Sequence, residues 1–388
     1  MKRFRLILLA GAALGLILGA AAPADSGTSL RAVYRANLKP DARSAFASPP
    51  ELAVQQASYK PGAAANPGFV FATDQANDPT AKITIFSPAG YTSTLGQAPG
   101  TTVGHAWALV LAGALGGAPL PLSGPVVVGN PADPALAAAY AQCKSPGDPV
   151  TPQEVLVLNT SLQGQSVQVP DFLNTAGPYV TQEICLPPPQ TAAFNATVVI
   201  ASFTLNGLFT NASAPGPYEW IADVTPYSGT TPNPSGTVET RTYVGLPSSF
   251  TFKRLKSKSS VVKFGGTLKV QGLNPAGIRL RLYYAAKPKP APTFLNPSAK
   301  GLGYPRPNKS VAAKGLKANG SYSITRPKVK KRTYFQMRLD DEWGLDISQG
   351  CLTPSPTHQP IPCVLELISP MTANQITVKP PKKKRHHR

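Results

Sequence analysis

Two histidines and five carboxylates are the side chains of this sequence that general acid–base or nucleophilic catalysis would require. His105 and His358 precede the C-terminal tail, and neither lies in a Gly-x-Ser-x-Gly segment or a comparable setting for a Ser-His-Asp triad. A hydrolase with paired catalytic carboxylates would draw on Glu154, Asp171, Glu183, Glu219 and Asp223. Their spacing along the chain does not indicate which of them face each other. We therefore expect no catalytic activity, with a secreted hydrolase as the alternative.

Acidic residues that resemble metal ligands occur in two places. The basic second half of the chain has one acidic cluster, formed by Asp340, Asp341, Glu342 and Asp346. A turn-like segment of the first half holds Asp74, Asn77 and Asp78. Such oxygen ligands suit Ca²⁺, but neither spacing is that of an EF-hand loop, so we favour local salt bridges over calcium binding. Because no Cys-x-x-Cys pair occurs either, the sequence predicts no metal site and no cofactor.

Four cysteines divide evenly between the two halves of the chain. Cys143 and Cys185 lie in the first half, and Cys351 and Cys363 lie in the second. An even number in an exported chain predicts disulfide bonds, and the grouping favours Cys143–Cys185 and Cys351–Cys363. Four cysteines allow three pairings in all, so the other two connectivities stay open.

The N-terminus has the order of a secretory signal. Basic residues precede an uncharged run from Leu6 to Ala22, and Ala22-Pro23-Ala24 supplies the small residues that signal peptidase requires. We predict cleavage after Ala24; a retained anchor helix is the alternative, but the run is short for a bilayer. No other apolar run reaches membrane length, so we expect a secreted, extracellular protein without an integral span.

Charge divides the remaining chain at Phe250. Residues 25–250 hold 8 Lys and Arg against 13 Asp and Glu, whereas residues 251–388 hold 27 against 5, a net charge of +22. This break sets the expected domain boundary. The predicted order is a signal peptide (1–24), an extended segment (25–67), a β-sandwich domain (68–250), a basic domain (251–380) and a disordered basic tail (381–388).

Short apolar runs between Gly, Pro, Asn and Asp recur through the first domain, which is typical of an all-β sandwich. The predicted strands are 69–72, 82–86, 105–111, 126–128, 155–158, 166–169, 197–205, 218–224 and 238–244. One helix is expected from Ala135 to Gln142, because Asp133 is a good N-cap and Pro134 suits the first helical position.

The second domain alternates apolar and polar residues with the period of a half-buried strand. Phe335, Met337 and Leu339 alternate with Gln336 and Arg338. The same pattern predicts strands around 267–271, 278–284, 322–324 and 376–378. The fold class is therefore predicted to be all-β, with two antiparallel β-sandwich domains.

Four segments of the second domain also share a pattern with a known family. They are Phe264-Gly265-Gly266-Thr267-Leu268-Lys269-Val270-Gln271-Gly272, Ile278-Arg279-Leu280, Ala318-Asn319-Gly320-Ser321-Tyr322 and Thr333-Tyr334-Phe335. Residues 257–379 thereby resemble the bacterial Ig-like modules of secreted and surface proteins. The chain departs from them by a Pro-rich insert between Tyr284 and Ala318 and by a longer insert that contains both late cysteines. Such modules serve as spacers, adhesins or carbohydrate binders.

Alternation places four cations on outward strand faces, where we expect contact with an anionic envelope polymer or polysaccharide. They are Lys269, Arg279, Arg281 and Arg338. Trp343, beside the acidic cluster of the long insert, is a further candidate contact, with packing under the insert as its alternative. Nucleic acid is a less favoured partner, because basic and aromatic residues are not interleaved as in single-strand binders.

Overall fold

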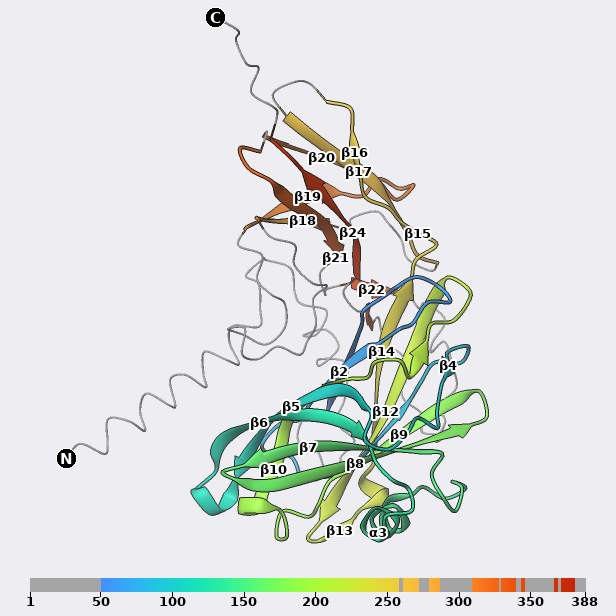
Figure 1. Ribbon diagram of the computed structural model, residues 1–388, viewed down its shortest axis with the longest axis vertical. Coiled ribbons are helices and arrows are strands. Elements are labelled where there is room, and N and C mark those ends of the chain that lie inside the picture. Colours follow the sequence, from blue (N-terminus) through green and yellow to red (C-terminus); the bar gives the residue numbers. More distant parts are fainter. Residues whose placement is uncertain are drawn as a thin grey trace, which may run out of the picture.

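The computed structural model describes residues 50–257, 261–271, 279–286, 309–327, 329–339, 343–345, 366–368 and 371–380. The fold is all-β, as predicted, and consists of curled antiparallel sheets in two domains (Figure 1). The described part of the chain contains no helix with the length and hydrophobicity that crossing a bilayer requires. The predicted signal peptide, the basic tail and the Cys351–Cys363 bond all lie outside the described residues.

The first domain contains β1 to β14 and one α-helix. Its strands are β1 (Glu51–Gln56), β2 (Pro67–Ala72), β3 (Thr80–Phe86), β4 (Thr92–Ser93), β5 (Thr102–Ala112), β6 (Ala118–Val128), β7 (Glu154–Leu162), β8 (Gln165–Ala176), β9 (Tyr179–Cys185), β10 (Ala196–Thr204), β11 (Phe209–Thr210), β12 (Gly216–Ser228), β13 (Thr231–Pro232) and β14 (Val238–Leu246). The helix is α3 (Pro134–Cys143), and three 3₁₀ turns cover Gly113–Leu115, Ala193–Asn195 and Pro234–Gly236.

Eleven of these strands form one sheet in the order β1-β2-β10-β5-β6-β7-β8-β9-β3-β12-β14. The sheet curls so far that β1 comes close to β14. Its concave side encloses an apolar core around Trp220, which makes edge-to-face contacts with the rings of Phe69, Tyr91 and Phe209. Burying this face supplies the main driving force for the curled sheet.

Helix α3 covers a patch on the convex side of the sheet. Its start agrees with the prediction, since the Asp133 carboxylate accepts a hydrogen bond of 2.8 Å from the Ala135 amide. Tyr140 is the one buried residue of the helix, and its ring packs on Phe172 of β8 at 4.9 Å between centroids. The helix therefore forms a second, smaller core outside the sheet.

The second domain is a sandwich of two four-stranded sheets. The first sheet has the strands β15 (Ser249–Phe250), β16 (Lys253–Leu255), β17 (Val261–Lys269) and β20 (Ser321–Pro327). The second has the order β19 (Lys309–Gly315), β18 (Arg279–Ala285), β21 (Thr333–Leu339) and β24 (Met371–Val378). Phe264 of one sheet meets Phe335 of the other, with ring centroids 4.7 Å apart.

Gly266 of β17 permits a close approach between two chain segments of this domain. A Cβ atom at this position would lie only 1.8 Å from the backbone oxygen of Thr251, so a larger residue would displace the segment between β15 and β16. This explains why the Gly265-Gly266 pair is placed in the middle of a strand.

A two-stranded ribbon from the long insert of the second domain joins the sheet of the first. The ribbon consists of β22 (Trp343–Leu345) and β23 (Glu366–Ile368), and β23 pairs in parallel with β14 at Tyr243 and Ile368. As predicted, the insert lies between two adjacent strands, because β21 and β24 pair directly.

Two domain limits differ from the prediction. The segment 25–67 was expected to lie outside the sandwich, but β1 pairs with β2 along its full length and belongs to the sheet. The second domain begins slightly before residue 251, since Ser249 and Phe250 form β15 and pair with β17.

Candidate functional site

Several strand ends meet at the end of the second domain that lies away from the first. Val261 at the start of β17 pairs with Pro327 at the end of β20, and Thr333 at the start of β21 pairs with Val378 near the end of β24. The opposite end of β17 leads toward the first domain, because Lys269 pairs with Ser249. The described residues next to these strand ends therefore lie at the same end of the domain.

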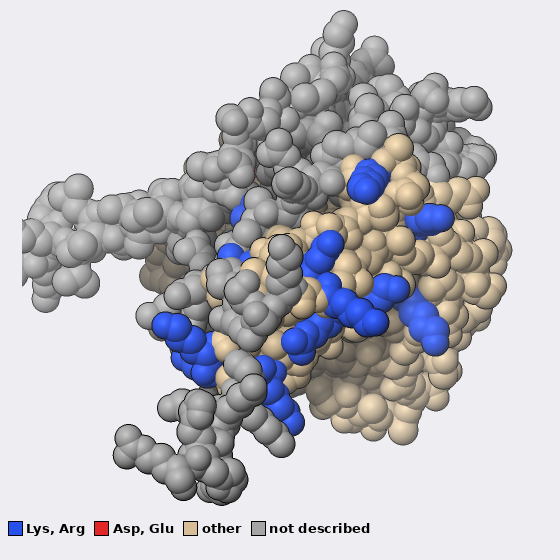
Figure 2. Space-filling view, turned by 90° about the horizontal axis from the view of Figure 1, so that it is seen from above, with Lys and Arg blue, Asp and Glu red and all other residues tan. Residues whose placement is uncertain are grey.

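Five exposed cations follow these strand ends, and we call this surface the basic end. It consists of Lys256, Lys330, Lys331, Arg332 and Lys379. Their side chains form no ion pair with any residue that the structure describes. Figure 2 looks onto this region and shows Lys and Arg but no Asp or Glu on its described part.

More cations flank the basic end on the outer sheet. Lys253 and Arg254 are exposed on β16, and Lys263 is half-buried on β17. Like charges on one surface repel one another, and an approaching anion relieves that repulsion. Because the charges are spread over the ends of several strands, the surface suits a multivalent anion better than one small ligand.

The five predicted contact residues are distributed differently. Lys269 is exposed at the end of β17 nearer the first domain, and Arg281 is half-buried on β18. Arg279 and Trp343 lie in β18 and β22, but their side chains are outside the described part of the structure. Lys269 therefore lies at the opposite end of the domain from the basic end.

The expectation that Arg338 reaches solvent is wrong. Arg338 is only 2% exposed, and its guanidinium lies over the ring of Tyr283 at 4.6 Å and donates two hydrogen bonds to the Gln336 side chain. The alternation along β21 is correct, but Gln336 on the same face is buried as well. Strand period alone does not distinguish a solvent-facing surface from a covered one.

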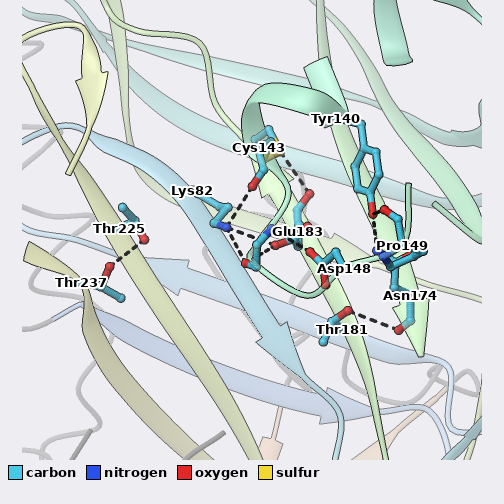
Figure 3. A network of polar contacts seen from close by, with 12 residues as sticks. Lys82, Tyr140, Cys143, Asp148, Pro149, Asn174, Thr181, Glu183, Thr225 and Thr237 are labelled. Atoms are coloured by element: carbon cyan, nitrogen blue, oxygen red, sulfur yellow. Dashed lines mark hydrogen bonds and ion pairs between the residues drawn. A yellow bond between two sulfur atoms is a disulfide. The ribbon is translucent and has the colours of Figure 1, made fainter. Parts of the chain in front are cut away.

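The Cys143–Cys185 disulfide is confirmed and joins α3 to β9. Figure 3 shows the polar network that surrounds it. The Lys82 ammonium donates to the Cys143 carbonyl at 2.9 Å, to the Ser145 hydroxyl at 2.7 Å and to the Glu183 carboxylate at 3.1 Å. The Ser145 hydroxyl in turn donates to Glu183 at 2.6 Å. The network fastens the end of α3 to the sheet.

This chain matches no model of a known protein family and no curated protein sequence.

The five candidate carboxylates do not converge on one open site. Glu183 belongs to the network beside the disulfide, and burial raises its pKa while Lys82 lowers it in part. Glu154 accepts a hydrogen bond of 2.6 Å from the Gly96 amide, and burial raises its pKa also. Asp171 points into the core.

Glu219 lies in a buried ionic network on β12 and β14. Arg241 donates to Glu219 at 2.8 Å and also binds Glu239, and the Tyr243 hydroxyl donates to Glu219 at 2.6 Å. Burial lowers the pKa of Arg241, but the two carboxylates outweigh it and raise the pKa overall. Asp223 is buried opposite Glu239 on the same strand pair.

The remaining candidates for catalysis or metal binding have ordinary surroundings. His105 is exposed on β5, and its backbone amide donates to the Thr204 hydroxyl. Asp74 accepts a hydrogen bond from the Ala76 amide within its turn. Among the described residues no three His, Cys, Asp or Glu side chains are grouped as metal ligands. His358 and the acidic cluster at 340–346 lie outside the described residues.

Sequence reasoning did not single out the residues of the basic end. The signal for them was the excess of 27 cations over 5 acids in residues 251–388. A charge count predicts that a domain is basic, but only the pairing of β17, β20, β21 and β24 shows which turns share one end.

Proposed function

We propose that this chain is a secreted, non-catalytic binding protein that is held at the cell envelope by its basic second domain. The ligand is an anionic envelope polymer or polysaccharide, bound mainly by charge at the basic end. The first domain then points away from the polymer and is available to other partners.

The observation that carries this proposal is the set of five exposed cations at one end of the domain, without an acidic residue on the described part of that face. A net charge of +22 over residues 251–388 is well above the magnitude of about 2 to 8 that keeps a small domain soluble. The resemblance to Ig-like modules of surface proteins supports the same location, and the predicted signal peptide supports export.

Two double variants of the mature chain test the role of the basic end. Lys330→Gln/Lys331→Gln removes two charges from it, and Lys60→Gln/Lys144→Gln removes the same number from exposed positions of the first domain. Binding of each protein to isolated cell walls and to dextran sulfate is measured as salt is raised. Charge contacts are screened over about 8 Å at physiological ionic strength, so binding of the unaltered protein should weaken steeply with salt.

The first variant should bind less tightly at low salt and show a shallower salt dependence, whereas the control should match the unaltered protein. On nucleic acids each neutralised phosphate contributes a slope of about one in a plot of log affinity against log salt, so we expect a fall of about two. Equal binding by both variants, or binding that salt does not weaken, would show that the basic end does not retain the protein.

A further inference from the structure

Four neighbouring strands of the first domain carry no charged side chain. β2, β10, β5 and β6 lie next to one another in the sheet, and none of them contains an Asp, Glu, Lys or Arg residue. His105 of β5 is the one residue among them that titrates near neutral pH. Protein surfaces in contact with water normally carry charges of both signs, so this part of the sheet is unusual.

The face of β5 that points away from the core is apolar. Ala106 and Val110 belong to buried clusters, so the alternation of the strand turns Trp107, Leu109 and Leu111 to the other side of the sheet. All three side chains are half-buried, and none of them packs against a core cluster of the described residues. They form an outer surface that lacks a described partner.

The flanking strands extend this apolar surface on both sides of β5. Leu109 pairs with Ile200 of β10 and with Pro121 of β6, and Leu111 pairs with Pro119 of β6. We call these outward residues the uncharged face, which consists of Trp107, Leu109, Leu111, Pro119, Pro121 and Ile200. Apolar patches of this kind mark places where another surface docks.

The chain enters the sheet at the border of the uncharged face. Glu51, the first residue of β1, pairs with Ala72 of β2, which pairs with Ile200 and so lies in the same row as Leu109. Residues 25–49, which lie outside the described residues, join the sheet at this point. Neighbouring strands are about 4.8 Å apart, so β5 lies about 15 Å from β1. Ten extended residues span roughly 33 Å, so the segment is long enough to reach β5 and to cross it.

The sequence of residues 25–49 is suited to an apolar face. Leu30, Val33, Tyr34 and Leu38 follow the spacing i, i+3, i+4 and i+8, which is that of one side of an amphipathic helix. Because the segment is attached beside the face, its effective concentration there is of millimolar order, whereas a free partner binds at its concentration in solution.

We propose that residues 25–49 dock on the uncharged face through the apolar side chains of Leu30, Val33, Tyr34 and Leu38. Burial of apolar surface drives this contact, because the face offers no charge to attract a partner. A second copy of the chain and a lipid surface are also apolar partners, but only the segment is held at the face by a covalent connection. The contact is independent of the charge-driven retention proposed above.

Trypsin cleavage after Arg35, followed by mass spectrometry, measures docking in the full mature chain, because a docked segment is cut only when it is released. Leu109→Asp places a charge in the uncharged face and should raise the cleavage rate about tenfold or more, the effect of losing one buried leucine contact. Ser166→Asp, at an exposed position of β8, should leave the rate unchanged. Circular dichroism establishes that each variant is folded.

Two variants of the segment test the same contact from the other side. Val33→Asp should raise the cleavage rate as Leu109→Asp does, whereas Ala32→Asp, on the opposite side of the predicted helix, should not. Combining Val33→Asp with Leu109→Asp should add little to either change alone, because both remove one contact. If Leu109→Asp does not fold, the comparison of Val33→Asp with Ala32→Asp decides the question.

The proposal is overturned if folded Leu109→Asp is cleaved at the unaltered rate, or if Val33→Asp and Ala32→Asp behave alike. It is also overturned if sedimentation shows a dimer that Leu109→Asp dissociates without a change in cleavage, because a second copy then covers the face. Binding to phosphatidylcholine vesicles that Leu109→Asp abolishes, again without a change in cleavage, would assign the face to lipid instead.

Discussion

Replacing Asp171 with Asn keeps the size of a fully buried side chain and removes its ability to ionise. The carboxyl has a pKa of about 8 in the folded protein, because it is buried and because Glu183 is near, against 3.8 for an ordinary aspartate. Between these values the folded chain retains a proton that the unfolded chain has released, so the free energy of unfolding falls as pH rises. At about 1.36 kcal/mol per pH unit, Asp171 accounts for a loss of about 4 kcal/mol between pH 5 and pH 8.

Urea unfolding at pH 5, 6.5 and 8, followed by circular dichroism, tests this value. The unaltered protein should lose about 4 kcal/mol more than Asp171→Asn over that range. Glu154 and Glu183 are present in both proteins, so the difference between the two pH profiles reports Asp171 together with its charge interaction with Glu183. Asp78→Asn, which changes an exposed carboxylate, should follow the unaltered protein. If the free energy of unfolding falls by the same amount with pH in Asp171→Asn and in the unaltered protein, the argument that Asp171 is protonated in the folded state is refuted.

Three further predictions concern α3 and the network beneath it. Replacing both Cys143 and Cys185 with Ala should lower the free energy of unfolding by about 4 kcal/mol in urea, since the bond closes a loop with a sequence separation of 42. Lys82→Met should cost about 3–5 kcal/mol by leaving the buried Glu183 without its cation, and adding Glu183→Gln should recover much of that loss; no recovery would contradict the ion-pair account. Asp133→Ala should cost about 1 kcal/mol through loss of the helix cap, measured by thermal unfolding.

Short apolar runs between turn residues predicted the strands of the first domain, and alternation predicted those of the second. All nine strands predicted for the first domain are present, and so are the helix and the strands predicted for the second. Two full-length strands of the first sheet, β1 and β9, were not predicted. Both contain polar residues at buried positions, Gln55 and Gln56 in β1 and Gln182 and Glu183 in β9. A strand with buried polar residues has no apolar period, so its pattern resembles that of a loop.

The candidate sites were harder to predict, because they depend on contacts between distant segments. Arg338 was placed on the correct strand face, but its burial depends on packing against Tyr283 and Gln336. Ala108 and Ala201 lie far apart in the sequence and become neighbours only through the pairing of β5 with β10. The charge asymmetry alone pointed to the basic second domain.

The ribbon of β22 and β23 has a mechanical consequence. The chain leaves the first sheet after β14, returns to it with the ribbon after β21, and leaves again to form β24, so it crosses the joint between the domains three times. Two domains connected by one chain segment can rotate about it as about a hinge. When three segments connect them, a bending force is divided among all three. A pull applied at the basic end would therefore reach the first domain through β23 as well as through the 246–249 connection. Tension would therefore have to separate β23 from β14, which pair at Tyr243 and Ile368, before the two domains could swing apart.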